Sequence, residues 1–170
     1  MIFHIKNPVR LAIHFSVFAL LFLLHFTGAP IVSIRSASPF LLLPMLTAYS
    51  MFNDELPSCI VGAVMGACVD SVSASPGCFN TITLLLVCVG TSFISKYLFN
   101  INARSAIVLS VLGNAFYYIL KWLVCYAFST PITDSLIYIF EYALPAVVFN
   151  AIFVVGFYFM EKRIYKNRVK

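Results

Sequence analysis

Long apolar runs alternate along the chain with short polar or turn-rich stretches. The runs approach the roughly 20 residues that a helix needs to cross a bilayer. They predict transmembrane helices over 11–28, 39–52, 57–72, 79–99, 105–128 and 136–160, followed by a basic tail over 161–170. The run at 39–52 is short and contains Pro44, so we expect a tilted helix, a helix in a thin part of the membrane, or a partly re-entrant segment.

The composition excludes a water-soluble domain of this size. Of the 170 residues, 62% are hydrophobic and 10% are charged, and the mean hydropathy is +0.98. Such a chain has too few polar groups to cover a folded surface in water. It is therefore predicted to be an all-α integral membrane protein, a compact bundle of six transmembrane helices that forms one domain over 1–170.

The positive charges mark one side of this predicted bundle. The net charge is +5, but the basic residues form no continuous polar face and no aromatic-basic motif, so nucleic-acid binding is not predicted. Lysine and arginine instead concentrate at the cytoplasmic ends of membrane segments. The residues that fit one common side are Lys6, Arg10, Lys96, Arg104, Lys162, Arg163, Lys166, Arg168 and Lys170. With six crossings both termini are predicted to be cytoplasmic, which requires that 39–52 crosses fully.

Small residues occur at helical spacing in two of the segments. Gly62, Gly66 and Asp70 are four residues apart, which places them on one face of a helix. The glycines are expected to admit another helix closely, and Asp70 ends the strip just before a Ser/Pro/Gly turn. Packing within the protein's own bundle is favoured over packing against a partner, because glycine pairs at this spacing are common in apolar sequences. Ala12 and Ser16 form a second small-residue pair that is expected to contact another helix.

A polar centre is predicted in the outer half of the membrane. Asn114, Tyr118, Lys121 and Cys125 follow one another at three- and four-residue steps and form a polar stripe on an otherwise apolar helix. On the predicted orientation Asp70, Lys121 and Glu141 also fall in the outer half, where buried charges usually pair or line a polar cavity. We expect Lys121 to pair with either Glu141 or Asp70. The alternative is that each side chain extends to the nearby membrane interface.

The sequence contains no catalytic or metal-binding motif. It has no phosphate-binding loop, no dinucleotide-binding fingerprint, and neither HExxH nor GxSxG. We therefore predict no enzyme activity, no catalytic residue and no cofactor. The five cysteines form no CxxC pair, and His14 and His25 have no cysteine or carboxylate at ligand spacing, so no metal site is predicted.

The helix with Gly62, Gly66 and Asp70, the turn Ser75-Pro76-Gly77 that follows it, the six-segment layout and the basic tail together resemble the MreD family. This family is the small membrane subunit of the bacterial rod-shape, or elongation, machinery. The resemblance implies a non-enzymatic scaffold in the bacterial cytoplasmic (inner) membrane, surrounded by lipid. Its implied partners are MreC, the cytoskeletal MreB, and the glycosyltransferase and penicillin-binding protein that build sidewall peptidoglycan.

The alternative function is that of a substrate-binding subunit of an energy-coupling-factor type vitamin transporter. Such subunits are also compact six-helix membrane proteins of similar length, so the architecture would be shared. Ala12 and Ser16 would then meet the coupling partner. The pocket would be lined by Asp70, Asn80, Lys121 and Glu141.

Overall fold

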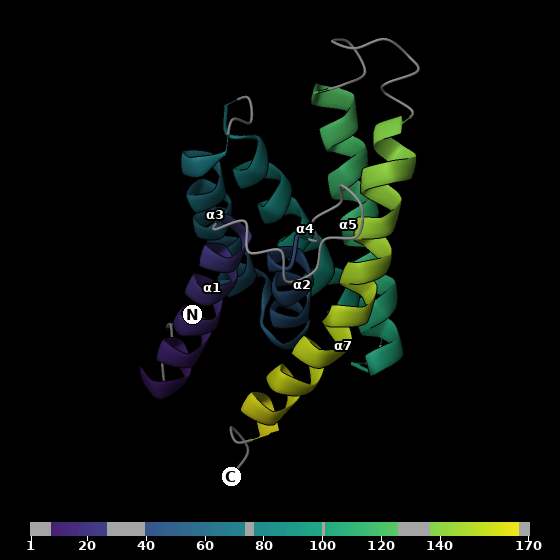
Figure 1. The fold of residues 1–170 in the computed structure, drawn as a ribbon. Coiled ribbons are helices and arrows are strands. Elements are labelled where there is room, and N and C mark those ends of the chain that lie inside the picture. Colours follow the sequence, from purple (N-terminus) through teal and green to yellow (C-terminus); the bar gives the residue numbers. More distant parts are fainter. Residues whose placement is uncertain (1–7, 27–39, 74–76, 100, 126–136, 167–170) are drawn as a thin grey trace.

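The computed structural model describes residues 8–26, 40–73, 77–99, 101–125 and 137–166 (Figure 1). These residues form helices and connections, with no strand among them. In chain order the elements are α1 (Pro8–Phe26), α2 (Leu42–Phe52), α3 (Glu55–Val72), α4 (Phe79–Tyr97), α5 (Ala103–Cys125), the π-helical η2 (Tyr138–Ala143) and α7 (Leu144–Lys166). Because η2 runs directly into α7, the two form one helix. This helix, α3, α4 and α5 are long and apolar enough to span a membrane, which confirms the predicted all-α membrane fold.

The shortest helix lies at the centre of the bundle. α2 contains 11 residues, which makes it about 16 Å long at the usual helical rise. It contacts α1, α3, α4, α5 and α7, and Figure 1 shows it between the α3–α4 pair and the α5–α7 pair. Nine of its 11 residues are buried. Its uniform hydrophobicity therefore reflects protein neighbours on all sides.

Pro44 does not interrupt α2. It lies in the first turn, where a backbone N–H has no partner within the helix and its loss therefore costs little. The Thr47 hydroxyl donates to the Pro44 carbonyl oxygen at 2.9 Å. The short run is thus a buried core helix in the described structure, and full crossing of the membrane by 39–52 stays a prediction.

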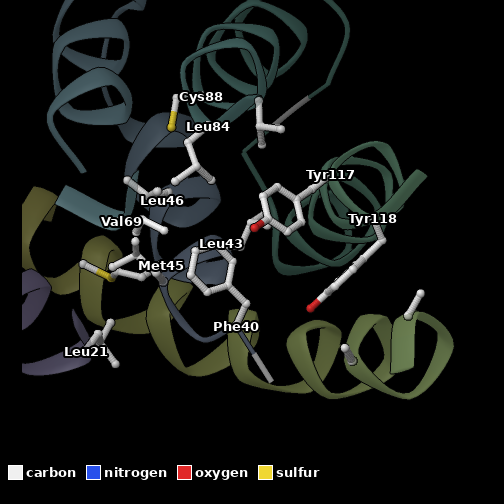
Figure 2. Packing of buried hydrophobic residues seen from close by; sticks show 14 of the residues in the cluster. Leu21, Phe40, Leu43, Met45, Leu46, Val69, Leu84, Cys88, Tyr117 and Tyr118 are labelled. Carbon is white, nitrogen blue, oxygen red and sulfur yellow. The ribbon is translucent and has the colours of Figure 1, made fainter. Parts of the chain in front are cut away.

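The hydrophobic core is assembled around α2. Figure 2 shows side chains from α2, α3, α4 and α5 converging on one another. The Phe40 ring, which precedes α2, stacks on the Tyr117 ring of α5 with centroids 5.3 Å apart. The other labelled members of this buried cluster are Leu21, Leu43, Met45, Leu46, Val69, Leu84, Cys88 and Tyr118. These contacts pack α4 and α5 against α2, and the two helices also contact each other directly.

α7 extends beyond the predicted segment 136–160. The residues from Glu161 to Lys166, assigned to a basic tail, continue α7 without a break. The reason is that Glu161 is 1% exposed and accepts a hydrogen bond from His14 of α1 at 2.9 Å. This contact places the first turns of α1 and the last turns of α7 at the same end of the bundle, as Figure 1 shows.

Candidate functional site

Asp70 caps the following helix from the end of its own. One carboxylate oxygen accepts the Asn80 backbone N–H at 3.0 Å and its side-chain N–H at 2.9 Å. The other oxygen accepts the Thr81 backbone N–H at 2.8 Å and its hydroxyl at 2.6 Å. The N-cap residue Cys78 makes no side-chain cap bond, so Asp70 satisfies two of the free N–H groups at the start of α4. A carboxylate at this end also interacts favourably with the helix dipole.

The network continues from α4 into α5. The Asn80 amide, 1% exposed, donates to the Ser73 hydroxyl at 3.1 Å. The side-chain carbonyl oxygen of Asn80 accepts a hydrogen bond from the Tyr117 hydroxyl at 2.8 Å. Asp70, Asn80 and Tyr117 thus connect α3, α4 and α5, and we call this set the Asp70 network.

Replacing Tyr117 with phenylalanine should cost about 1–2 kcal/mol of stability, because it leaves the buried side-chain carbonyl oxygen of Asn80 without this donor. Thermal unfolding in detergent, followed by circular dichroism, measures the effect. Tyr97→Phe is the matched control, since the Tyr97 side chain is exposed at the end of α4 and should change stability by less than about 0.5 kcal/mol. Equal losses in the two variants would contradict a specific role for the hydroxyl.

Both glycines of the predicted strip face α4. A Cβ atom added at Gly66 would lie 2.8 Å from the backbone carbonyl oxygen of Asn80 and closer still to the Thr81 Cα. One added at Gly62 would lie 3.0 Å from the Cys88 sulfur and from the Leu84 carbonyl oxygen. The missing side chains therefore allow the α4 backbone to approach α3 closely. The same strip places Asp70 within reach of the start of α4.

The residues of the polar stripe on α5 have different surroundings. Asn114 is fully buried, accepts the Asn150 side-chain N–H of α7, and donates to the Ser110 carbonyl oxygen at 2.7 Å. Tyr118 lies in the hydrophobic core. Asn114 and Tyr118 both face inward, but Asn114 makes polar contacts whereas Tyr118 lies among apolar side chains. The result is a second interhelical polar contact, between α5 and α7.

Lys121 is not brought together with either expected carboxylate. Its ammonium lies 6.0 Å from the centroid of the Tyr117 ring, and no carboxylate among the described residues lies within ion-pair distance of it. Asp70 is occupied by donors of α4, and Glu141 is exposed within the π-helical η2. The expected pairing of Lys121 with Glu141 or Asp70 is therefore absent from the described structure.

The sequence pattern did not reveal the contact between His14 and Glu161, because 147 residues separate the two positions. The side chain of Ala12 lies outside the described residues, and Ser16 is exposed on α1, so the expected contact of this pair with another helix stays a prediction. Asn80 and Thr81 were also missed as partners of Asp70, and Tyr117 was missed as a donor to Asn80. A signal for the first two was available: they begin the helix that follows the Asp70 turn, where N–H groups need acceptors.

The described residues contain no group of three or more histidine, cysteine or acidic side chains arranged to hold a metal ion. The hydrogen bonds of the site join helices, since the donors to Asp70 are groups of α4 and the donor to Asn80 is a hydroxyl of α5.

The comparisons with known proteins identify the family. The model of the family described as rod shape-determining protein MreD matches residues 6–167. No curated protein sequence and no solved structure matched the chain. The family match covers nearly the whole chain, including Gly62, Gly66 and Asp70, and it confirms the resemblance drawn from the sequence. This chain therefore belongs to the MreD family, and its role is in rod shape determination.

Proposed function

We propose that this protein is a non-enzymatic scaffold subunit of the peptidoglycan elongation complex, packed in the membrane against partner membrane proteins such as MreC. MreD is a shape-determining structural family, and membership supports association with other proteins of the rod-shape complex. The further partners in the proposal are MreB, the elongation glycosyltransferase and the penicillin-binding protein. These assignments rest on the family resemblance.

The observation that carries the scaffold proposal is the saturation of Asp70. Its two oxygens together accept four hydrogen bonds from α4, so this carboxylate holds two helices in place. A free base would need an accessible lone pair directed at a substrate. Here the polar groups stiffen the bundle, and a stiff bundle presents a fixed outer surface to partner helices at a low entropic cost.

The proposed location is the bacterial cytoplasmic membrane with both termini in the cytoplasm. The exposed Lys162 and Arg163 lie at the end of α7, and Lys96 lies at the end of α4, 3.3 Å from Asp54 and 3.2 Å from Glu55. Lysine and arginine favour the cytoplasmic side. This distribution supports an inner position for these helix ends.

Co-purification from native membranes tests the proposal. The tagged protein, expressed at its natural level in a rod-shaped bacterium, should recover MreC after mild solubilisation. The Asp70→Asn variant should recover at least fivefold less MreC at equal membrane abundance, because the frame that presents the binding surface is loosened. Glu141→Gln is the matched control, since Glu141 is exposed, and it should recover as much MreC as the unmodified protein.

Two results would contradict the scaffold proposal. One is a complete absence of MreC from the purified material under conditions that retain other membrane complexes. The other is a tightly bound vitamin in the purified protein, which would instead support the transporter function.

A further inference from the structure

An apolar groove lies between α1 and α7 at the basic end of the bundle. It has a volume of about 490 Å³ and is lined by Ile13, Gly156, Phe159, Met160, Arg163 and Ile164. The α7 residues recur at three- and four-residue steps, so they form one continuous stripe along the helix. Ile13 supplies the opposite wall from α1.

Two features of the structure form the groove: a contact that joins its two helices and a glycine on its α7 wall. His14 and Glu161, the neighbours in sequence of Ile13 and Met160, form the contact that joins α1 to α7. A Cβ atom added at Gly156 would meet no other atom within 4 Å. The missing side chain at Gly156 therefore leaves space inside the groove that no other part of the described structure fills.

The charge at the groove is positive. Arg163 lines it and is exposed, whereas Glu161, the nearby carboxylate on the same helix, is buried and engaged by His14. Lys162 is also exposed, but it points over the Tyr158 ring, 5.7 Å from its centroid, and does not line the groove. A ligand in the groove would thus meet an apolar surface and one guanidinium.

We propose that this groove is a binding site for an anionic phospholipid of the membrane leaflet at the basic end of the bundle. One acyl chain occupies the apolar groove along α7, and the phosphate accepts hydrogen bonds from the Arg163 guanidinium, whose planar donors match phosphate oxygens. Basic pockets between transmembrane helices are suited to such headgroups. The site is independent of the scaffold function.

The size of the groove favours a lipid chain over a partner helix. Its α7 wall extends from Gly156 to Ile164, which is about 12 Å of helix. A partner helix is itself about 10–12 Å wide and packs along several turns. An acyl chain is narrower and bends to follow a short groove.

Native mass spectrometry of the full-length protein released from nanodiscs tests this site. Nanodiscs of equal phosphatidylglycerol and phosphatidylcholine content should yield protein that retains phosphatidylglycerol preferentially. Arg163→Gln should lower the retained phosphatidylglycerol about fivefold, because the phosphate loses the hydrogen bonds from the guanidinium. Lys162→Gln removes the same charge one residue away and should change retention by less than about twofold, because its ammonium lies over the Tyr158 ring and does not line the groove.

A second pair of variants tests the apolar part. Gly156→Leu fills the groove and should abolish retention of the lipid, whereas Gly90→Leu, placed at another helical glycine with open space around it, should leave retention unchanged. Equal losses in Arg163→Gln and Lys162→Gln would overturn the proposal, since they would indicate diffuse attraction to the whole basic end. Absence of a preference for phosphatidylglycerol in the unmodified protein, or a polypeptide crosslinked at position 156 in native membranes, would also overturn it.

Discussion

Replacing Gly66 with alanine should destabilise the protein by about 3 kcal/mol, in the upper part of the range for overpacking. The added methyl group would meet the backbone carbonyl oxygen of Asn80 and the backbone of Thr81. A helix backbone cannot rotate away as a side chain can. α3 and α4 would have to separate, which would also stretch the bonds from Asp70. The change in melting temperature in detergent, or in the force needed to unfold single molecules in bilayers, measures the loss.

Two other glycines provide graded controls for this prediction. Gly90→Ala, also within α4, meets no atom within 4 Å and should be neutral or stabilise by up to about 1 kcal/mol through helix propensity. Gly62→Ala should have an intermediate effect, because one of its close neighbours is the Cys88 sulfur, which can adjust. A loss in Gly90→Ala as large as that in Gly66→Ala would show that close packing is not the cause.

Replacing Asp70 with asparagine should cost about 3 kcal/mol, although the two side chains have nearly the same shape. Hydrogen bonds to a charged acceptor contribute about 1.5–3 kcal/mol each when they are isolated. Asparagine retains one acceptor oxygen, but its NH2 group would face donors of either Asn80 or Thr81. The start of α4 would then lose part of its cap.

Asp70→Asn is best compared with Glu141→Gln under the same thermal unfolding conditions. Both variants remove one negative charge and keep the side-chain shape, but Glu141 is exposed and its replacement should change stability by less than about 0.5 kcal/mol. If Asp70→Asn unfolded at the temperature of the unmodified protein, the four bonds would not be stabilising the fold.

The sequence predicts which residues share one face of a helix better than it predicts which neighbouring helix meets that face. The four-residue spacing of Gly62, Gly66 and Asp70 correctly places them on one face, because helical periodicity is a local property. Which helix meets that face is a tertiary property. For Lys121 and Glu141, similar predicted depth suggested a pair, but Glu141 is exposed on the π-helical η2 and lies beyond ion-pair distance of Lys121.

The length and hydropathy of the apolar runs predict where helices form, but not what surrounds each helix. They predicted helices in the ranges where the described residues form them, but a short apolar run is compatible with both a spanning helix and a core helix. α2 is surrounded by five helices, and none of these contacts is visible in 39–52 alone. The contact between His14 and Glu161 is hidden from the sequence for the same reason, since it depends on how α1 crosses α7.

The cap that Asp70 provides also has a consequence for how the chain enters the membrane during synthesis. α3 leaves the ribosome before α4, and at that moment its carboxylate lacks the donors of Asn80 and Thr81. An unsatisfied charge on a membrane helix is costly, and the arrival of α4 removes that cost. The two helices are therefore expected to partition into the bilayer together as a hairpin, with α3 held near the translocation channel until its partner has been made.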